Sequence, residues 1–178
     1  MKPNAPKIHE DGNLISHRTL AVGDVEKGFR DSDYVFEGVY RTQRVAHCCL
    51  ETHGSIASYE PSTGRLTIWS STQVPFNIRF VLSIVLGMSM GKIRVIKPYM
   101  GAGFGSKDEL FDEPIVALLS KATGRPIKII YSREEEFMFT RTRHPSKVYV
   151  KTGVKKDGML MARYVKAIFE KGAYATAG

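Results

Sequence analysis

Glycines occupy alternate positions 101, 103 and 105 in a stretch that continues with a lysine and two acids. Glycine reaches backbone angles that a Cβ forbids, and it lets another group approach the main chain closely. Successive main-chain amides in such a loop can form a concave anion site. Segment 99–109 therefore predicts a cradle for a flat, polar or anionic group. A mobile surface loop is the alternative, because glycine commonly collects in turns and loops.

Two familiar glycine motifs do not fit this loop. A P-loop needs a lysine directly after its second glycine, but Ser106 separates Gly105 from Lys107. A dinucleotide fingerprint needs Gly-x-Gly-x-x-Gly, but the third glycine comes one position early and Ser106 takes the expected place. The sequence therefore supports nucleotide binding through neither motif.

The loop instead resembles a signature of another family. Segment 101–108 is similar to the Gly-Gly-Gly-Phe-Gly-Gly-Lys-Glu motif of the molybdenum hydroxylases, the xanthine dehydrogenase and aldehyde oxidase family. Segment 47–53 resembles the family's His-x-x-Leu-Glu-x-His, and segment 70–73 resembles its Ser-Thr-Gln ahead of the loop. Three later segments also fall in family order, namely 124–128, 132–135 and 143–145. The resemblance covers most of residues 23–178 and implies a fragment of the molybdopterin-binding large subunit.

The residue pattern predicts an α+β fold, a mixed sheet with helices packed on it. The expected strands are 35–42, 55–59, 66–70, 92–96, 127–131, 148–150 and 160–168. The expected helices are 24–30 with Asp24 as N-cap, 75–86 ended by Gly87, a segment through 118–121 ended by Gly124, and a short helix begun by a capping box of Ser132 and Glu135. The helix from Pro75 is apolar almost all round, so we expect it to be buried on most faces. We expect Asp112 or Glu113 to cap the next helix.

The domain organisation follows from the same resemblance. Residues 23–178 are expected to form the first part of a molybdenum-cofactor-binding domain. Residues 1–22 have turn residues and little periodicity, so we interpret them as a linker or the end of a preceding domain.

The resemblance also implies the cofactor-binding residues. Gln73 matches a glutamine that lies near the molybdenum and hydrogen-bonds an oxygen ligand without being a metal ligand itself. From the residues alone, Gln73 fits equally an amide that caps a strand end. Gly103, Phe104 and Gly105 match residues beside the cofactor, where the aromatic ring shapes the substrate side. For Phe104 the alternative is a buried anchor of the loop.

Two residues depart from the signature, and two more bear on the substrate. Ala102 replaces a glycine, a mild change if its φ is negative, and Ser106 adds a hydroxyl near the expected pocket. Asp108 aligns with a glutamate that touches the purine in xanthine-oxidising members, and Glu109 beside it could take that role. The expected substrate contacts are thus Phe104, Asp108 and Glu109. The alternative is that both acids begin the following helix.

For the other ionisable residues and the cysteines, structural roles are expected. The family holds its metal through a pterin dithiolene, so we expect the histidines at 47, 53 and 144, and also Glu51, to be structural. Cys48 and Cys49 are adjacent, cannot join distant segments, and are expected to line a buried strand edge. Arginines 133, 141 and 143 could bind cofactor phosphates, but pairing with the acids at 134–136 is the simpler interpretation.

Composition narrows the function classes. The chain has 178 residues, is 43% hydrophobic and carries a net charge of +8. Its basic residues are dispersed and no nucleic-acid-binding motif occurs, so we expect no nucleic-acid partner. The longest apolar run, around 81–86, is too short to cross a membrane, and no secretory leader is visible. With no cysteine spacing typical of disulfides, a cytoplasmic location is expected.

The resemblance implies a molybdenum-dependent oxidoreductase that hydroxylates purines, aldehydes or N-heterocycles with water as the oxygen source. Iron–sulfur clusters and FAD are expected on other domains or subunits, and the protein is expected to form a homo-oligomer. The family's catalytic glutamate lies far beyond Gly178, so this chain is expected to hold no catalytic residue and to be inactive alone. The alternative is a non-catalytic cofactor-binding or subunit-interaction module of the same fold.

Overall fold

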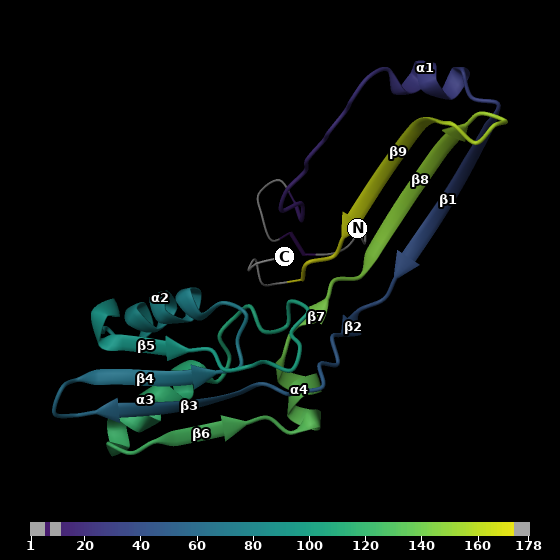
Figure 1. The fold of residues 1–178 in the computed structure, drawn as a ribbon. Coiled ribbons are helices and arrows are strands. Elements are labelled where there is room, and N and C mark those ends of the chain that lie inside the picture. Colours follow the sequence, from purple (N-terminus) through teal and green to yellow (C-terminus); the bar gives the residue numbers. More distant parts are fainter. Residues whose placement is uncertain (1–5, 8–11, 173–178) are drawn as a thin grey trace. The chain divides into compact units, whose positions relative to one another are not determined.

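The computed structural model describes residues 6–7 and 12–172, and the chain divides into two compact units. The first unit combines the residues up to Arg41 with Lys147–Ile168, and the second is built mainly from Thr42–Ser146. Each unit has a sheet of its own (Figure 1). No helix among the described residues has both the length and the apolar character to cross a membrane.

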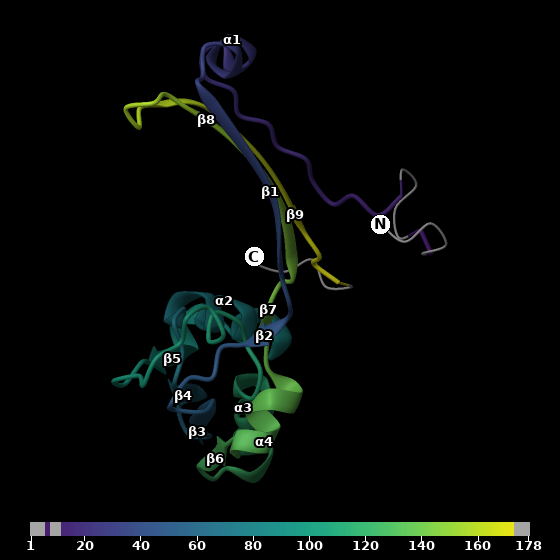
Figure 2. The same ribbon diagram turned by 90° about the vertical axis from the view of Figure 1, so that its right-hand side faces the viewer.

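The first unit is a three-stranded sheet with one short helix. Its strands are β1 (Tyr34–Thr42), β8 (Ser146–Val154) and β9 (Leu160–Phe169), in the order β1-β8-β9, and its helix is α1 (Val25–Arg30). Figure 2 shows the three strands running alongside one another. Asp24 caps α1 as expected, accepting a hydrogen bond of 2.8 Å from the amide of Lys27. A Cβ on Gly28 would lie 2.7 Å from the carbonyl oxygen of Met161, so glycine lets α1 approach β9.

The second unit contains a four-stranded mixed sheet. Its strands are β3 (Gly54–Glu60), β4 (Arg65–Ser70), β5 (Ile93–Ile96) and β6 (Ile127–Ile130), in the order β5-β4-β3-β6. β3 is antiparallel to both β4 and β6, whereas β4 and β5 are parallel. A parallel pair needs a crossover connection, which α2 (Pro75–Val85) provides. The α+β fold expected from the sequence is thereby confirmed.

The other elements of the second unit are two further helices, a 3₁₀ turn and a pair of very short strands. They are α3 (Glu113–Thr123), α4 (Arg133–Phe139), the 3₁₀ turn Met90–Lys92, and the two-residue strands β2 (Val45–Ala46) and β7 (Thr142–Arg143), which pair with each other. Two residues carry no periodicity, so β2 and β7 were not expected from the sequence. Ser132 and Glu135 form the expected capping box of α4.

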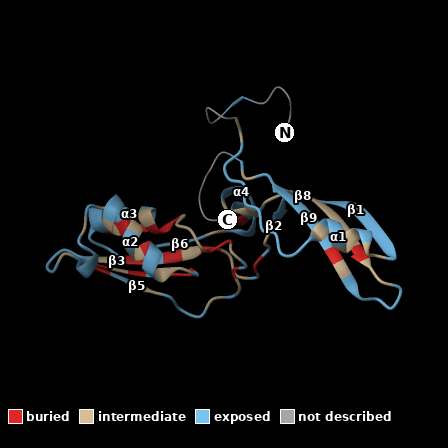
Figure 3. Cartoon of the chain, turned by 90° about the horizontal axis from the view of Figure 1, so that it is seen from above, coloured by how far each residue is buried: buried red, intermediate tan, exposed pale blue. Residues whose placement is uncertain are grey.

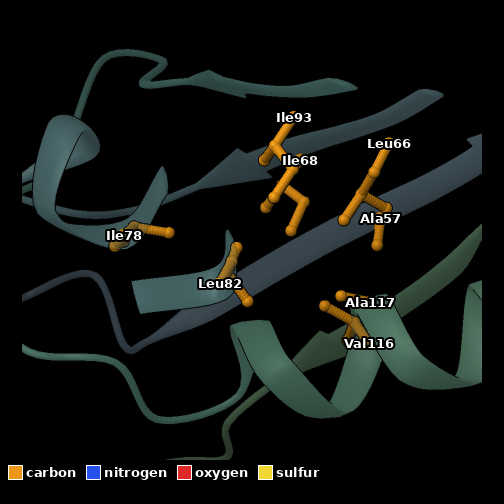
Figure 4. Packing of buried hydrophobic residues seen from close by; sticks show 8 residues of the cluster. All are labelled: Ala57, Leu66, Ile68, Ile78, Leu82, Ile93, Val116 and Ala117. Carbon is orange, nitrogen blue, oxygen red and sulfur yellow. The ribbon is translucent and has the colours of Figure 1, made fainter. Parts of the chain in front are cut away.

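The hydrophobic core lies between this sheet and the helices α2 and α3. Ile78 and Leu82 of α2 point toward the sheet residues, as do Val116 and Ala117 of α3 (Figure 4). Their partners on the strands are Ala57, Leu66, Ile68 and Ile93. In the burial colouring of Figure 3, red segments lie on strands and helices of this unit, and a few lie in the first unit. The core therefore fixes the sheet against one helical layer.

Two expectations about helix environment need correction. α2 buries only Ile78 and Leu82 fully, and Phe76 at its start is 82% exposed, so burial on most faces was wrong. A helix that packs on one sheet face buries one stripe only. Asp112 occupies the N-cap position of α3, but its carboxylate accepts a hydrogen bond from the Ser55 hydroxyl instead of capping the helix. Burial, reinforced by the neighbouring Glu113, raises the pKa of Asp112 to about 6.

Candidate functional site

The direction of the strands brings three separate segments to one edge of the second sheet. β4 and β5 are parallel, so the segments that follow them, 71–74 and 97–109, leave the sheet at the same edge. β3 runs the opposite way, so the segment before it, 47–53, reaches that edge too. In open α/β sheets, ligands bind outside the carboxyl ends of parallel strands. The three motif segments picked out in the sequence therefore meet where a ligand site is expected.

Gln73 is held against the glycine loop by its side-chain oxygen and its main-chain amide. Its side-chain Oε1 accepts hydrogen bonds from the amides of Gly105, at 2.9 Å, and Lys107, at 3.3 Å. The main-chain amide of Gln73 donates to the carbonyl oxygen of Lys107 at 2.7 Å. Its Nε2 has no hydrogen-bond partner in the described part of the chain, and the side chain is exposed. The two N–H groups of Nε2 are therefore available to a ligand, while the hydrogen bonds to Oε1 hold the side chain in place.

Close packing requires two of the three loop glycines. A Cβ on Gly103 would lie 2.4 Å from Oε1 of Gln73, and a Cβ on Gly101 would lie 2.8 Å from Cβ of Glu51. Gly105 is required for a different reason, because its φ of +92° lies in the region that favours glycine. The loop therefore packs directly on the segments that precede α2 and β3.

Phe104 projects from this loop. Its φ is +53° and 67% of its surface is exposed, so the alternative of a buried anchor was wrong. Nη1 of Arg143 lies 3.4 Å from the carbonyl oxygen of Phe104 and donates to it. The aromatic ring is consequently accessible to a ligand beside the loop.

The two departures from the glycine signature have different consequences. Ala102 has a φ of +77°, so it is not the mild change that a negative φ would allow. Ser106 is buried, and both its amide and its hydroxyl donate to the carbonyl oxygen of Gly103 at 2.9 Å. The added hydroxyl of Ser106 therefore closes the turn from within the loop.

Replacing Ala102 by glycine is expected to stabilise the loop. A left-handed conformation costs a non-glycine residue about 1–2 kcal/mol, whereas glycine loses about 0.5–1 kcal/mol more than alanine through chain entropy. Hydrogen exchange of segment 99–109 in the full-length protein should therefore slow in Ala102→Gly. The control is Ala122→Gly in the last turn of α3, where φ is negative and the same change should cost up to about 1 kcal/mol. Faster exchange of the loop in Ala102→Gly would contradict the strain argument.

An ion pair lies beneath the loop. Lys107 is fully buried, and its Nζ donates to Oε2 of Glu51 at 2.8 Å and to the hydroxyl of Ser71 at 2.7 Å. The same Oε2 accepts hydrogen bonds from the Ser71 hydroxyl at 2.6 Å and from the amide of Gly101 at 2.8 Å. Burial opposes ionisation of Glu51, but these hydrogen bonds outweigh it and hold the pKa of Glu51 below its ordinary value. Glu51 is therefore an anion under the loop.

A second buried pair supports the loop from the side of α4. Nδ1 of His53 lies 2.8 Å from Oε1 of Glu136, and the His53 amide donates to Oε2 of Glu136 at 2.7 Å. Nε2 of His53 lies 3.1 Å from the carbonyl oxygen of Ser106, which can only accept, so Nε2 carries a proton. The structural role expected for His53 fits these contacts.

The arginines have other partners than expected. Arg133 donates to the carbonyl oxygens of Cys49 and Leu50, at 2.7 and 2.8 Å. Arg141 forms ion pairs with Glu109 and, at 3.7 Å, with Asp108. Pairing with the acids at 134–136 was therefore wrong, because Glu135 serves the capping box and Glu136 is buried on His53.

Neither acid of the substrate prediction begins a helix. α3 starts at Glu113, so Asp108 and Glu109 lie in the turns ahead of it and that alternative was wrong. Oδ1 of Asp108 is buried without a hydrogen-bond partner, although Arg141 is near. Nδ1 of His47 is likewise buried and unpaired, and burial lowers the pKa of His47, so its ring is neutral at pH 7.

The two cysteines do not line a strand edge. Cys48 is exposed with a φ of +52°, and Cys49 is buried in the loop before β3, where its thiol contacts the carbonyl oxygen of Gly103 at 3.3 Å. Among the described residues, no group of three or more His, Cys, Asp or Glu side chains is arranged to hold a metal ion.

Comparison with known proteins places this arrangement in a family. The profile of the molybdopterin cofactor-binding domain matches residues 8–178. The chain is 42% identical over 178 residues to a probable xanthine dehydrogenase subunit of Bacillus subtilis (strain 168), covering all of this chain and 24% of that protein. It is 36% identical to "Nicotinate dehydrogenase large molybdopterin subunit" of Eubacterium barkeri, again over the whole chain and 42% of that protein.

Solved structures agree with the sequence relatives. The aldehyde oxidoreductase from Desulfovibrio desulfuricans ATCC 27774 superposes with a TM-score of 0.78 at 25% identity, over 95% of this chain and 19% of that one. Quinoline 2-oxidoreductase from Pseudomonas putida 86 gives a TM-score of 0.70 at 31% identity, over 81% of this chain and 18% of that one. The chain spans less than half of each of these four proteins. It belongs to the molybdopterin cofactor-binding domain family of the molybdenum hydroxylases.

Proposed function

We propose that this chain is part of the molybdenum-cofactor-binding subunit of a hydroxylase or dehydrogenase that oxidises purines, aldehydes or N-heterocycles with water as the oxygen source. One observation carries the proposal. Gln73 presents unpaired amide donors at the ligand edge of the sheet, while two loop amides occupy its acceptor atom. An amide can donate there without carrying charge, which suits an oxygen ligand of a metal.

The residues at this edge fit molybdopterin in several ways. Gln73 would donate from Nε2 to an oxygen of the cofactor. The amides of Gly105 and Lys107 are occupied by Gln73. The amides of Ala102, Gly103 and Phe104 have no acceptor in the described segments and are left for the cofactor. When bound, the cofactor supplies the metal centre for hydroxylation and two-electron transfer.

The substrate side is proposed at Phe104, Asp108 and Glu109. The exposed ring of Phe104 offers an apolar face for a flat substrate. Arg141 compensates the charge of both acids, which would act as hydrogen-bond acceptors toward a neutral substrate. Oδ1 of Asp108 is buried, whereas both acidic side chains keep some exposed surface, so the substrate contact would be made by the other carboxylate oxygens of the two acids.

The wider assembly is proposed on the same basis. Residues 23–178 would be the first part of the cofactor-binding domain and residues 1–22 a lead-in to it. Iron–sulfur clusters and FAD would lie on other domains or subunits, and the catalytic base would lie outside this chain. A homo-oligomer and a cytoplasmic location complete the proposal, and exposed apolar side chains such as Phe76 and Phe80 on α2 are available for such contacts.

The test is the metal and pterin content of the full-length protein that carries this chain. It should be purified from a host with an active cofactor pathway, then analysed for molybdenum and for pterin fluorescence after oxidation. We expect molybdenum and pterin in equal amounts, close to one of each per chain. A folded protein with neither would refute the proposal. If the cofactor is present, turnover of hypoxanthine, an aldehyde and an N-heterocycle would separate the substrate classes.

A further inference from the structure

Lys107 is the most deeply buried large side chain at the site. Its relative exposure is 0%, although lysine is almost never fully buried unless it is paired. Nζ has two partners, Oε2 of Glu51 and the hydroxyl of Ser71, each within 2.8 Å. Burying a charged group costs desolvation free energy even when it has such partners, which points to a role of the pair in holding the structure around it.

The partner carboxylate also holds the start of the glycine loop. Oε2 of Glu51 accepts from the amide of Gly101 at 2.8 Å, and the Glu51 amide donates to the carbonyl oxygen of Gly101 at 3.2 Å. Lys107 therefore links the end of the loop to its beginning through one carboxylate oxygen. The closed loop between residues 101 and 107 contains Gly103, Phe104 and Gly105.

The main chain of Lys107 faces Gln73 at the same time. Its amide donates to Oε1 of Gln73 at 3.3 Å, and its carbonyl oxygen accepts from the Gln73 amide at 2.7 Å. Residue 107 thus carries the Glu51 contact on its side chain and the Gln73 contact on its backbone. Displacing the ammonium would move the two main-chain atoms of Lys107 that contact Gln73, and one of them, the amide, orients the Gln73 side chain.

We infer that Lys107 is a positioning residue that acts on the cofactor through Gln73. The inference rests on the proposed function, because it assumes that the outward Nε2 of Gln73 meets the cofactor. The Lys107–Glu51 pair holds residue 107, residue 107 holds Oε1 of Gln73, and Nε2 is thereby aimed away from the loop. The role of Lys107 is geometric, since its buried ammonium cannot touch the ligand itself.

A double-mutant cycle on the full-length protein tests this chain of contacts. Lys107→Met and Gln73→Ala are made singly and together, and the rate of pterin release is followed by fluorescence after oxidation. Each single change is expected to speed release by about tenfold or more, as mutation of groups that orient metal ligands commonly does. The double variant should release pterin no faster than the faster single variant, because both changes interrupt one path.

The alternatives give different results. If Lys107 only stabilises the fold, the two effects multiply in the double variant, and that result overturns the inference. Unchanged release in Lys107→Met overturns it as well. Lys92→Met is the matched control, because the Nζ of Lys92 also donates a hydrogen bond, to the carbonyl oxygen of Thr63 at 2.9 Å, but from an exposed position. Its release rate should equal that of the unmodified protein.

A replacement variant and the cofactor content of the unmodified protein complete the test. If Lys107→Met does not fold, Glu51→Gln replaces it in the cycle, because it removes the charge that holds Nζ and keeps an amide oxygen in its place. If the unmodified protein holds neither molybdenum nor pterin, the proposed function fails. If it holds both and the cycle is multiplicative, the proposed function stands and the inference alone fails.

Discussion

Gly103→Ala is expected to empty the cofactor site while leaving the fold intact. The added Cβ would lie 2.4 Å from Oε1 and 2.7 Å from Cδ of Gln73, closer than non-bonded atoms approach. Gln73 has a flexible, exposed side chain, so it would rotate away and lose the hydrogen bonds from Gly105 and Lys107. Its Nε2 donors would then no longer point toward the ligand. We expect a loss of about 10–100-fold in cofactor affinity, measured as pterin and molybdenum retained after dialysis.

A second glycine provides the control for this change. Gly91 has only the Ser89 hydroxyl near its Cβ position, at 3.7 Å, and that is ordinary contact. Gly91→Ala should therefore retain the cofactor as the unmodified protein does. Hydrogen exchange over β3–β6 should be the same in both variants, since neither residue belongs to the core. Full cofactor retention in Gly103→Ala would show that the Gln73 contacts do not hold the ligand.

Sequence reasoning predicted the elements whose signals are local. The cap at Asp24 and the capping box at Ser132 each need only residues within one turn, and both occur as expected. Gly87 and Gly124, with φ of +60° and +65°, follow α2 and α3 as the expected stop residues. The burial of each element was harder to predict. How much of α2 is buried depends on how many layers surround it, and a periodicity argument cannot supply that number.

In the candidate site, too, local signals could be predicted from the sequence and contacts between distant residues could not. The glycine loop and Gln73 were picked out from motifs, and strand direction explains why they meet. The pairs Lys107–Glu51 and His53–Glu136 were missed because their members lie 56 and 83 residues apart. A signal for the first pair existed. Lysine and glutamate of opposite charge occur in two motifs that the mixed sheet brings to one edge, so their pairing could have been proposed.

Glu136→Ala is expected to cost the second unit about 3–5 kcal/mol, the usual penalty for breaking a buried pair. Oε2 of Glu136 accepts from the His53 amide and Oε1 lies 2.8 Å from Nδ1 of His53, so removing the carboxylate would leave two buried groups without a partner. His53 would also lose the contact that orients it, and its hydrogen bond to the carbonyl oxygen of Ser106 would weaken. Hydrogen exchange of β3 and β6 in the full-length protein measures this cost as a local opening free energy.

Glu136→Gln separates the loss of charge from the loss of hydrogen bonds. The amide oxygen can still accept from the His53 amide, and the amide nitrogen can donate to Nδ1 when that atom carries no proton. His53 keeps a proton on Nε2 for Ser106 in that tautomer, so every buried group stays paired. The cost should therefore fall to about 1 kcal/mol, the scale of one hydrogen bond. Equal losses in the two variants would instead mean that the charge of Glu136, and with it an imidazolium at His53, is what stabilises the loop.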